Sequence, residues 1–203
     1  MTSELTTAGG AKRAGRLSRD LGLAAAAYDA GRHADALRLL RPIVEAAPNA
    51  GAARELYGLT LYRLGRWKAA RTELEAARAL TGSFEQLPVL ADCERALGRH
   101  VAVEKLIEEL RQASPPPEIM AEGRLVLAGS LADRGRFTDA IAVLAPVEPD
   151  RARPKPWHLR AWYALADLYE RAGDVPRARQ LFRRLVTRDP EFFDAVDRLS
   201  ALG

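Results

Sequence analysis

The stretch RAWYALADLYERAGDVPRARQLFRRLVTRDP, residues 160–190, decides the fold. It consists of two amphipathic segments on either side of Gly173, and in each segment apolar residues recur at the three- and four-residue spacing of a helix with one buried stripe. A glycine between two such segments can end the first helix by adopting a left-handed backbone conformation without steric cost. The stretch therefore predicts a helical hairpin.

The same pattern occurs five times along the chain. It is read in the phrases AGRHADALRLL from residue 30, LGRWKAARTEL from 64, LGRHVAVEKLI from 97, RGRFTDAIAVL from 134 and AGDVPRARQLF from 172. The turn glycines are Gly31, Gly65, Gly98, Gly135 and Gly173, separated by 34, 33, 37 and 38 residues. A period near 34 residues is typical of stacked helical hairpins. No segment alternates apolar and polar residues with a period of two, so we expect no strands.

The last unit resembles the tetratricopeptide repeat (TPR) family. The matching residues are Trp162, Leu165, Ala166, Tyr169, Ala178, Phe182 and Pro190, with Ala166 where glycine is common. Small residues at two of these places let the helices of a hairpin approach closely, and the large ones fill the space between hairpins. The resemblance covers residues 17–190 and implies an all-α fold, a right-handed α-α superhelix (solenoid) of about five helix-turn-helix hairpins.

These units set the expected boundaries. We expect a flexible N-terminal tail at 1–15 and a single repeat domain at 16–203. The repeats are expected at about 17–50, 51–83, 84–117, 121–152 and 159–190, with a capping helix at 191–203. Clustered prolines in SPPPE from residue 114 and in VEPDRARPKPW from 147 predict loops.

The third repeat departs from the pattern. Glu94 stands where a large apolar residue is usual, and Pro88 lies near the start of the first helix of this repeat. Proline is tolerated only in a first turn, so this helix begins late, near Leu87, or is kinked. We expect an irregular hairpin here.

Composition limits the class of protein. A chain of 203 residues, 48% of them hydrophobic, can bury a sizeable core, and the single cysteine excludes an internal disulfide framework. The N-terminal stretch has no apolar core of the signal-peptide kind, and the run at 21–30 is too short to span a bilayer. We expect a cytoplasmic protein with no membrane partner.

A search for chemistry yields no positive signal. His33 and His100 occupy a place that Trp67, Phe137 and Val175 take in the other repeats, which indicates packing. His158 is expected in a loop beside Trp157, with no second histidine or cysteine at ligand spacing. Cys93 lies inside a helix and is expected to be inert. No phosphate-binding glycine loop and no hydrolase or metalloprotease motif is present. We expect no catalytic residue, no metal, no cofactor and no enzymatic activity.

The resemblance also implies where a partner binds. In TPR arrays the first helices of successive hairpins line a concave surface, and peptides or partner helices often bind there. The residues expected to contact a partner are Tyr28, Glu55, Tyr62, Arg63, Asp92, Arg95, Glu122, Asp133, Tyr163, Asp167 and Glu170. Acids outnumber arginines on this surface, so we expect a scaffold or adaptor that binds a protein or peptide with a basic segment.

Other interpretations remain open at this point. The charges on the first helices could simply be solubilising. The net charge of +4 and a sequence pI near 9.5 leave room for nucleic-acid binding through convex arginines, although the basic residues are scattered among 27 acids. A self-assembling structural module, and so a homo-oligomer, is a third possibility. Members of the family that capture the C-terminal carboxylate of chaperones use lysine and asparagine on this surface. Such a clamp is not expected here, because the only asparagine is Asn49, in a loop.

Overall fold

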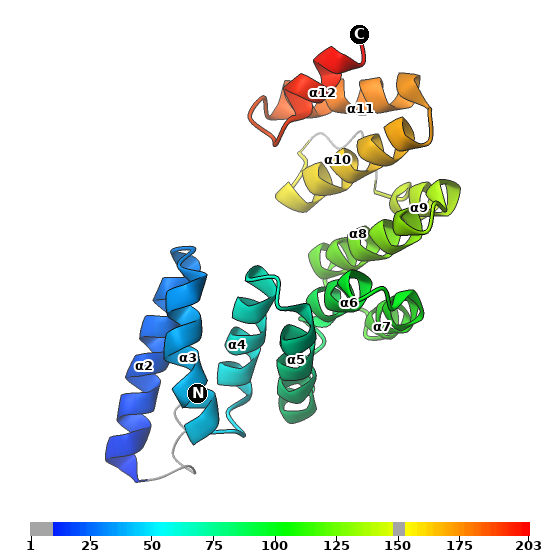
Figure 1. Cartoon of the computed structure of the whole chain (residues 1–203). Coiled ribbons are helices and arrows are strands. Elements are labelled where there is room, and N and C mark those ends of the chain that lie inside the picture. The colour runs from blue at the N-terminus through cyan, green and yellow to red at the C-terminus, as the bar shows by residue number, and fades with distance from the viewer. Residues whose placement is uncertain (1–9, 148–152) are drawn as a thin grey trace. The chain divides into compact units, whose positions relative to one another are not determined.

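The computed structural model describes residues 10–147 and 153–203, and every regular element in these two ranges is a helix (Figure 1). Their contacts divide the chain into two compact units, residues 1–99 and 100–203. The expectation of an all-α fold is confirmed.

Unit 1 contains five described helices. They are α2 (Ala11–Asp29), α3 (His33–Ala46), α4 (Gly51–Arg63), α5 (Trp67–Thr81) and α6 (Leu87–Ala96). The first four form two hairpins, in which α2 packs on α3 and α4 packs on α5. Between the hairpins α3 contacts α4, and α5 contacts α6. A buried cluster that includes Ala24, Leu40 and Ile43 holds the first hairpin against α4.

Unit 2 contains six described helices. They are α7 (His100–Gln112), α8 (Pro117–Asp133), α9 (Phe137–Leu144), α10 (Pro156–Arg171), α11 (Val175–Arg188) and α12 (Ala195–Ala201). Helix α8 packs on α7 and α9, α10 packs on α11, and α12 covers α11. Among the described residues, Trp162 and Phe182 have the two largest fully buried side chains, and the sequence pattern placed both in the space between hairpins.

All five turn glycines have the left-handed backbone that the sequence predicts, with φ between 69° and 83°. After each of them the next amide donates to a carbonyl five residues back, as from Arg32 to Ala27 at 2.9 Å and from Asp174 to Tyr169 at 2.8 Å. This bond is the signature of a Schellman motif, which satisfies carbonyls that the end of a helix leaves without partners. One glycine thus ends the first helix of each repeat and sets the start of the second.

The third repeat is irregular in the way its sequence indicates. Helix α6 begins at Leu87 with Pro88 in its first turn, and it has 10 residues, fewer than the other first helices. Glu94 is buried, and its carboxylate pairs with Arg71 at 3.4 Å and with Arg99 at 3.5 Å. The two helices of this repeat, α6 and α7, are assigned to different units.

Several expected boundaries differ from the structure. Helix α2 begins at Ala11, so residues 11–15 belong to a helix and not to a tail, while residues 1–9 lie outside the described ranges. Helix α8 begins at Pro117, four residues before the expected start of its repeat. The end of the fourth repeat, residues 148–152, also lies outside the described ranges.

The expected loop position of His158 is wrong. His158 lies in the first turn of α10, where it is buried, and its Nδ1 accepts a hydrogen bond of 2.9 Å from the backbone N–H of Lys155. The reason is Pro156, which occupies the first turn of the helix. In a first turn the backbone N–H has no partner within the helix, so a proline, which lacks it, is tolerated there. This proline therefore starts a helix instead of prolonging the loop.

Candidate functional site

The residues expected to contact a partner lie on the first helices α2, α4, α6, α8 and α10, in two groups. The first-helix face of unit 1 comprises Tyr28, Glu55, Tyr62, Arg63, Asp92 and Arg95. The first-helix face of unit 2 comprises Glu122, Asp133, Tyr163, Asp167 and Glu170.

In unit 1, a tyrosine joins α2 to α4. Arg63 donates from Nε to the hydroxyl oxygen of Tyr28 over 3.3 Å. This hydrogen bond is the main reason that the pKa of Arg63 lies above its usual value. The ring of Tyr28 also lies 5.2 Å from that of His33, so the half-buried His33 packs as the sequence indicates.

A second tyrosine joins α4 to α6. Tyr62 donates its hydroxyl hydrogen to Oδ2 of Asp92 over 2.6 Å, and Arg95 donates to Oδ1 of the same carboxylate over 2.7 Å. Partial burial, followed by the hydrogen bond to Asp92, raises the pKa of Tyr62 well above its usual value. The phenol therefore stays protonated near neutral pH and remains a donor.

Glu55 lies one step along the same face. Its Oε1 accepts a hydrogen bond of 3.0 Å from Nε2 of Gln86, the residue immediately before α6. Because the donor is a neutral amide, this contact leaves the negative charge of Glu55 uncompensated. Unit 1 thus retains acidic character on its first-helix face.

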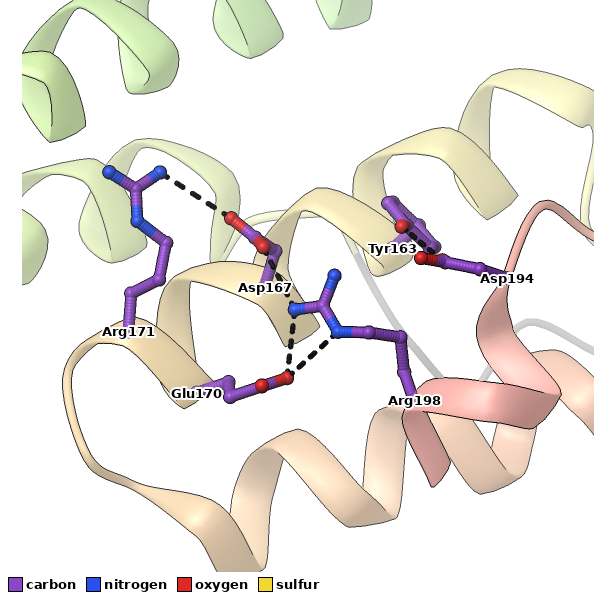
Figure 2. A network of polar contacts seen from close by, with 6 residues as sticks. All are labelled: Tyr163, Asp167, Glu170, Arg171, Asp194 and Arg198. Atoms are coloured by element: carbon purple, nitrogen blue, oxygen red, sulfur yellow. Dashed lines mark hydrogen bonds and ion pairs between the residues drawn. The ribbon is translucent and has the colours of Figure 1, made fainter. Parts of the chain in front are cut away.

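In unit 2, arginines compensate most of the acids. Arg160 donates from Nε to Oε1 of Glu122 over 3.0 Å, which links α10 to α8. Arg198 of α12 donates to Asp167 over 2.9 Å and to Glu170 over 2.8 Å (Figure 2). Partial burial lowers the pKa of Arg198, but its two carboxylate partners outweigh this effect and raise the pKa above its usual value.

The same close-up shows a third tyrosine. Tyr163 donates its hydroxyl hydrogen to Asp194, which directly precedes α12 (Figure 2). The rings of Phe182 and Phe193 lie 5.8 Å and 5.2 Å from that of Tyr163. Asp133 is exposed at the C-terminal end of α8.

Sequence reasoning missed three residues that complete these contacts: Gln86, Asp194 and Arg198. A signal for them exists, because the hydrogen-bonded pairs on these faces are separated by nearly one repeat. Tyr62 and Asp92 are 30 residues apart, and the pairs Glu55–Gln86, Tyr163–Asp194 and Asp167–Arg198 are each 31 apart. An offset of 31 residues, slightly shorter than one repeat, leads from Glu55, Tyr163 and Asp167 to these three residues.

Across the described residues, no three histidine, cysteine or acidic side chains gather closely enough to hold a metal ion. Cys93 is fully buried, and burial, followed by the nearby Asp92 and Glu94, raises the pKa of its thiol to about 12. None of the helices within the described ranges is long and apolar enough to cross a membrane.

The family follows from both fold and sequence. A family model described as tetratricopeptide repeat matches residues 21–83 and 125–191, which is more than half of the chain. This chain belongs to the tetratricopeptide repeat family. The segment between the two matched stretches, residues 84–124, contains the irregular third repeat.

Solved structures described as TPR proteins or TPR-like repeats share this fold. A TPR protein of Thermus thermophilus has a TM-score of 0.70 at 19% identity, over 92% of this chain and 98% of that one. Repeats of a putative kinesin light chain from Podospora anserina reach 0.65 at 21% identity, over 85% and 94%. YrrB, described as a TPR protein with an unusual peptide-binding site, reaches 0.56 at 17% identity, over 88% and 89%. No curated protein sequence matches the chain significantly.

Membership of this family supports a protein–protein interaction scaffold. Proteins of the family bind peptides or other proteins and are generally not enzymes.

Proposed function

We propose that the chain is a non-enzymatic adaptor that binds a peptide or protein segment on its first-helix faces, and that this segment is basic. The observation that carries the proposal is a repeated contact in which a tyrosine of a first helix donates to a carboxylate 30 or 31 residues later in the chain. Tyr62 with Asp92 and Tyr163 with Asp194 place a half-buried ring beside an acid in both units.

Such a contact suits a cationic side chain. An aromatic face attracts an arginine or lysine, and a carboxylate offers about four lone-pair positions, of which the internal donors use only some. Glu55 and Asp133 add negative charge to the first-helix faces, one in each unit. Arginines of the chain itself pair with some of these acids and reduce the net negative charge of the faces. A partner therefore needs only a few basic residues and not a long polycation.

The test begins with a phage library of random peptides of about 12 residues, a length that covers three helical turns. Peptides selected on the whole chain are expected to be rich in arginine and lysine. Their affinity is measured by fluorescence anisotropy for the wild type and for a variant with Glu55→Lys and Asp133→Lys. We expect the variant to bind at least about tenfold more weakly, because two attractive charges become repulsive.

A matched control reverses two exposed acids of second helices, Glu45→Lys and Asp139→Lys. It changes the net charge equally, again with one substitution in each unit, but leaves the first-helix faces intact. Equal weakening by both variants would mean that only overall charge matters. Unchanged affinity in the Glu55 and Asp133 variant would contradict the proposal.

A further inference from the structure

Helix α9 is much shorter than the other second helices. It has 8 residues, whereas α3, α5, α7 and α11 have 13 to 15. It ends at Leu144, two residues before Pro146, which has no amide hydrogen to donate to the helix. Six residues of helix correspond to about 9 Å, so α9 itself covers that much less of α8 than a full-length second helix would.

A groove occupies this part of unit 2. Its volume is about 370 Å³, and it lies between α7 and the end of α9, with α8 beneath. Its apolar lining comes from Ile107 of α7, Met120 and Leu127 of α8, and Val143 and Pro146 at the end of α9. A second cavity of about 270 Å³ adjoins it and shares Met120, Arg124 and Pro146. Methionine adapts its shape to different apolar side chains, as a binding groove requires.

One charge in this groove is not compensated. Glu104 accepts a hydrogen bond from Arg134 at 2.6 Å, and Glu108 accepts one from Arg111 at 2.7 Å, so both acids of the lining are paired. Arg124, which lines both cavities, has no hydrogen bond or ion pair with any of the described residues. A ligand that fits the groove therefore supplies apolar groups and a carboxylate.

The groove is separate from the first-helix face of unit 2. At 3.6 residues per turn, Met120, Arg124 and Leu127 lie within about 60° of one another on α8. Glu122 lies about 170° and Asp133 about 150° from the middle of this set, on the opposite side of the same helix. A ligand in the groove and one on the first-helix face can therefore bind at the same time.

We infer that this groove docks a short amphipathic helix of a partner protein, whose apolar stripe faces Ile107, Leu127 and Val143 and whose aspartate or glutamate pairs with Arg124. From Glu104 to Arg111 the wall of α7 measures about 10 Å, which is two turns of a helical ligand. The ligand is thus acidic and apolar, whereas the partner proposed for the first-helix faces is basic.

The test selects the same kind of phage library on the whole chain after depleting it on the variant Val143→Glu. In this variant the new carboxylate repels the expected acidic ligand, and burying that carboxylate under a ligand would cost desolvation free energy. The variant keeps its other surfaces, so depletion removes peptides that bind outside the groove. We expect the remaining peptides to carry apolar residues at three- and four-residue spacing together with an acid. Their affinity is expected to fall at least about tenfold in Val143→Glu and about fivefold in Arg124→Gln.

Two controls keep the result interpretable. Ala142→Glu places the same charge one residue away, at an exposed position outside the lining, and should leave affinity unchanged. Circular dichroism and a thermal melt check each fold, and if Val143→Glu melts early, Pro146→Glu at an exposed lining position replaces it. Selection of basic peptides in this experiment would overturn the inference, and so would an affinity that Arg124→Gln leaves unchanged. Neither result would affect the proposal for the first-helix faces.

Discussion

Close contact between helices depends on a few small residues. Gly58 of α4 is buried, and a Cβ at this position would lie 2.8 Å from Cγ of Leu74 and 3.1 Å from its backbone nitrogen. The equivalent places in other repeats hold alanines, such as Ala128 and Ala166, and both are buried. In the α4–α5 pair the helices are close enough at Gly58 to exclude even a methyl group.

We predict that Gly58→Ala lowers the free energy of unfolding by about 1 to 3 kcal/mol, although alanine is the better helix former. The matched control is Gly22→Ala in α2, where nothing lies within 4 Å of the added Cβ. There, helix propensity alone should raise stability by about 1 kcal/mol. Urea denaturation of both variants measures the difference, and a stabilised Gly58→Ala would show that the α4–α5 contact is looser than described.

We predict that Cys93 resists alkylation by iodoacetamide in the native protein and reacts once the chain is unfolded in urea. Its thiol is buried, and with a pKa of about 12 it forms no reactive thiolate near neutral pH. Mass spectrometry of the alkylated protein checks this result, and rapid native labelling would contradict it.

The same pKa predicts a dependence of stability on pH. Because folding raises the pKa of Cys93 from an ordinary value of 9.0, its contribution is complete below pH 9 and is lost as the pH rises toward 12. The stability of the wild type should therefore fall relative to that of Cys93→Ala above pH 9. A parallel pH profile for the two proteins would mean that the thiol is not buried in solution.

At the scale of helices, apolar periodicity and turn glycines predict the order of elements because both act locally. Each glycine determines the end of its own helix, so the five hairpin turns follow directly from the chain. Prolines are harder to interpret, because Pro117 and Pro156 start helices whereas Pro146 lies beyond the end of one. The sequence around each proline does not show whether a helix begins or ends there. The packing of the residues that follow the proline decides between the two.

The junction of α10, α11 and α12 depends on Phe182. Its ring is fully buried, lies 5.8 Å from that of Tyr163, and has the guanidinium of Arg198 5.1 Å above it. Phe182→Ala should cost about 3 to 5 kcal/mol, because it leaves a cavity between the helices. Phe193→Ala is the control, since that ring is 71% exposed, and it should change stability by less than about 0.5 kcal/mol. A thermal melt compares them, and similar melting temperatures would refute the packing.

At the scale of the whole chain, the sequence predicts the family and the helix faces but not the contacts across them. Tyr62 and Asp92 are both expected on the first-helix face of unit 1, yet their hydrogen bond depends on how far α4 and α6 are offset. Arg198 shows the same limit, because a capping helix is expected from its apolar residues, whereas its pairing with Asp167 and Glu170 is a tertiary contact. The acidic surface is consequently more compensated than a count of charges indicates.

The same limit applies to the groove of unit 2. Its apolar lining comes from three helices, and its opening results from the early end of α9 at Leu144. Neither feature has a motif in the sequence. The proposal that the chain is an adaptor depends on one claim, that it binds a basic segment on its first-helix faces.

The dissociation constant of a selected basic peptide, measured as a function of salt, tests this claim most directly. For the wild type the affinity should fall steeply between about 0.05 and 0.5 M NaCl, because screening weakens attraction between charges. The Glu55→Lys and Asp133→Lys variant should bind more weakly and depend less on salt. Identical curves for the two proteins would contradict the claim.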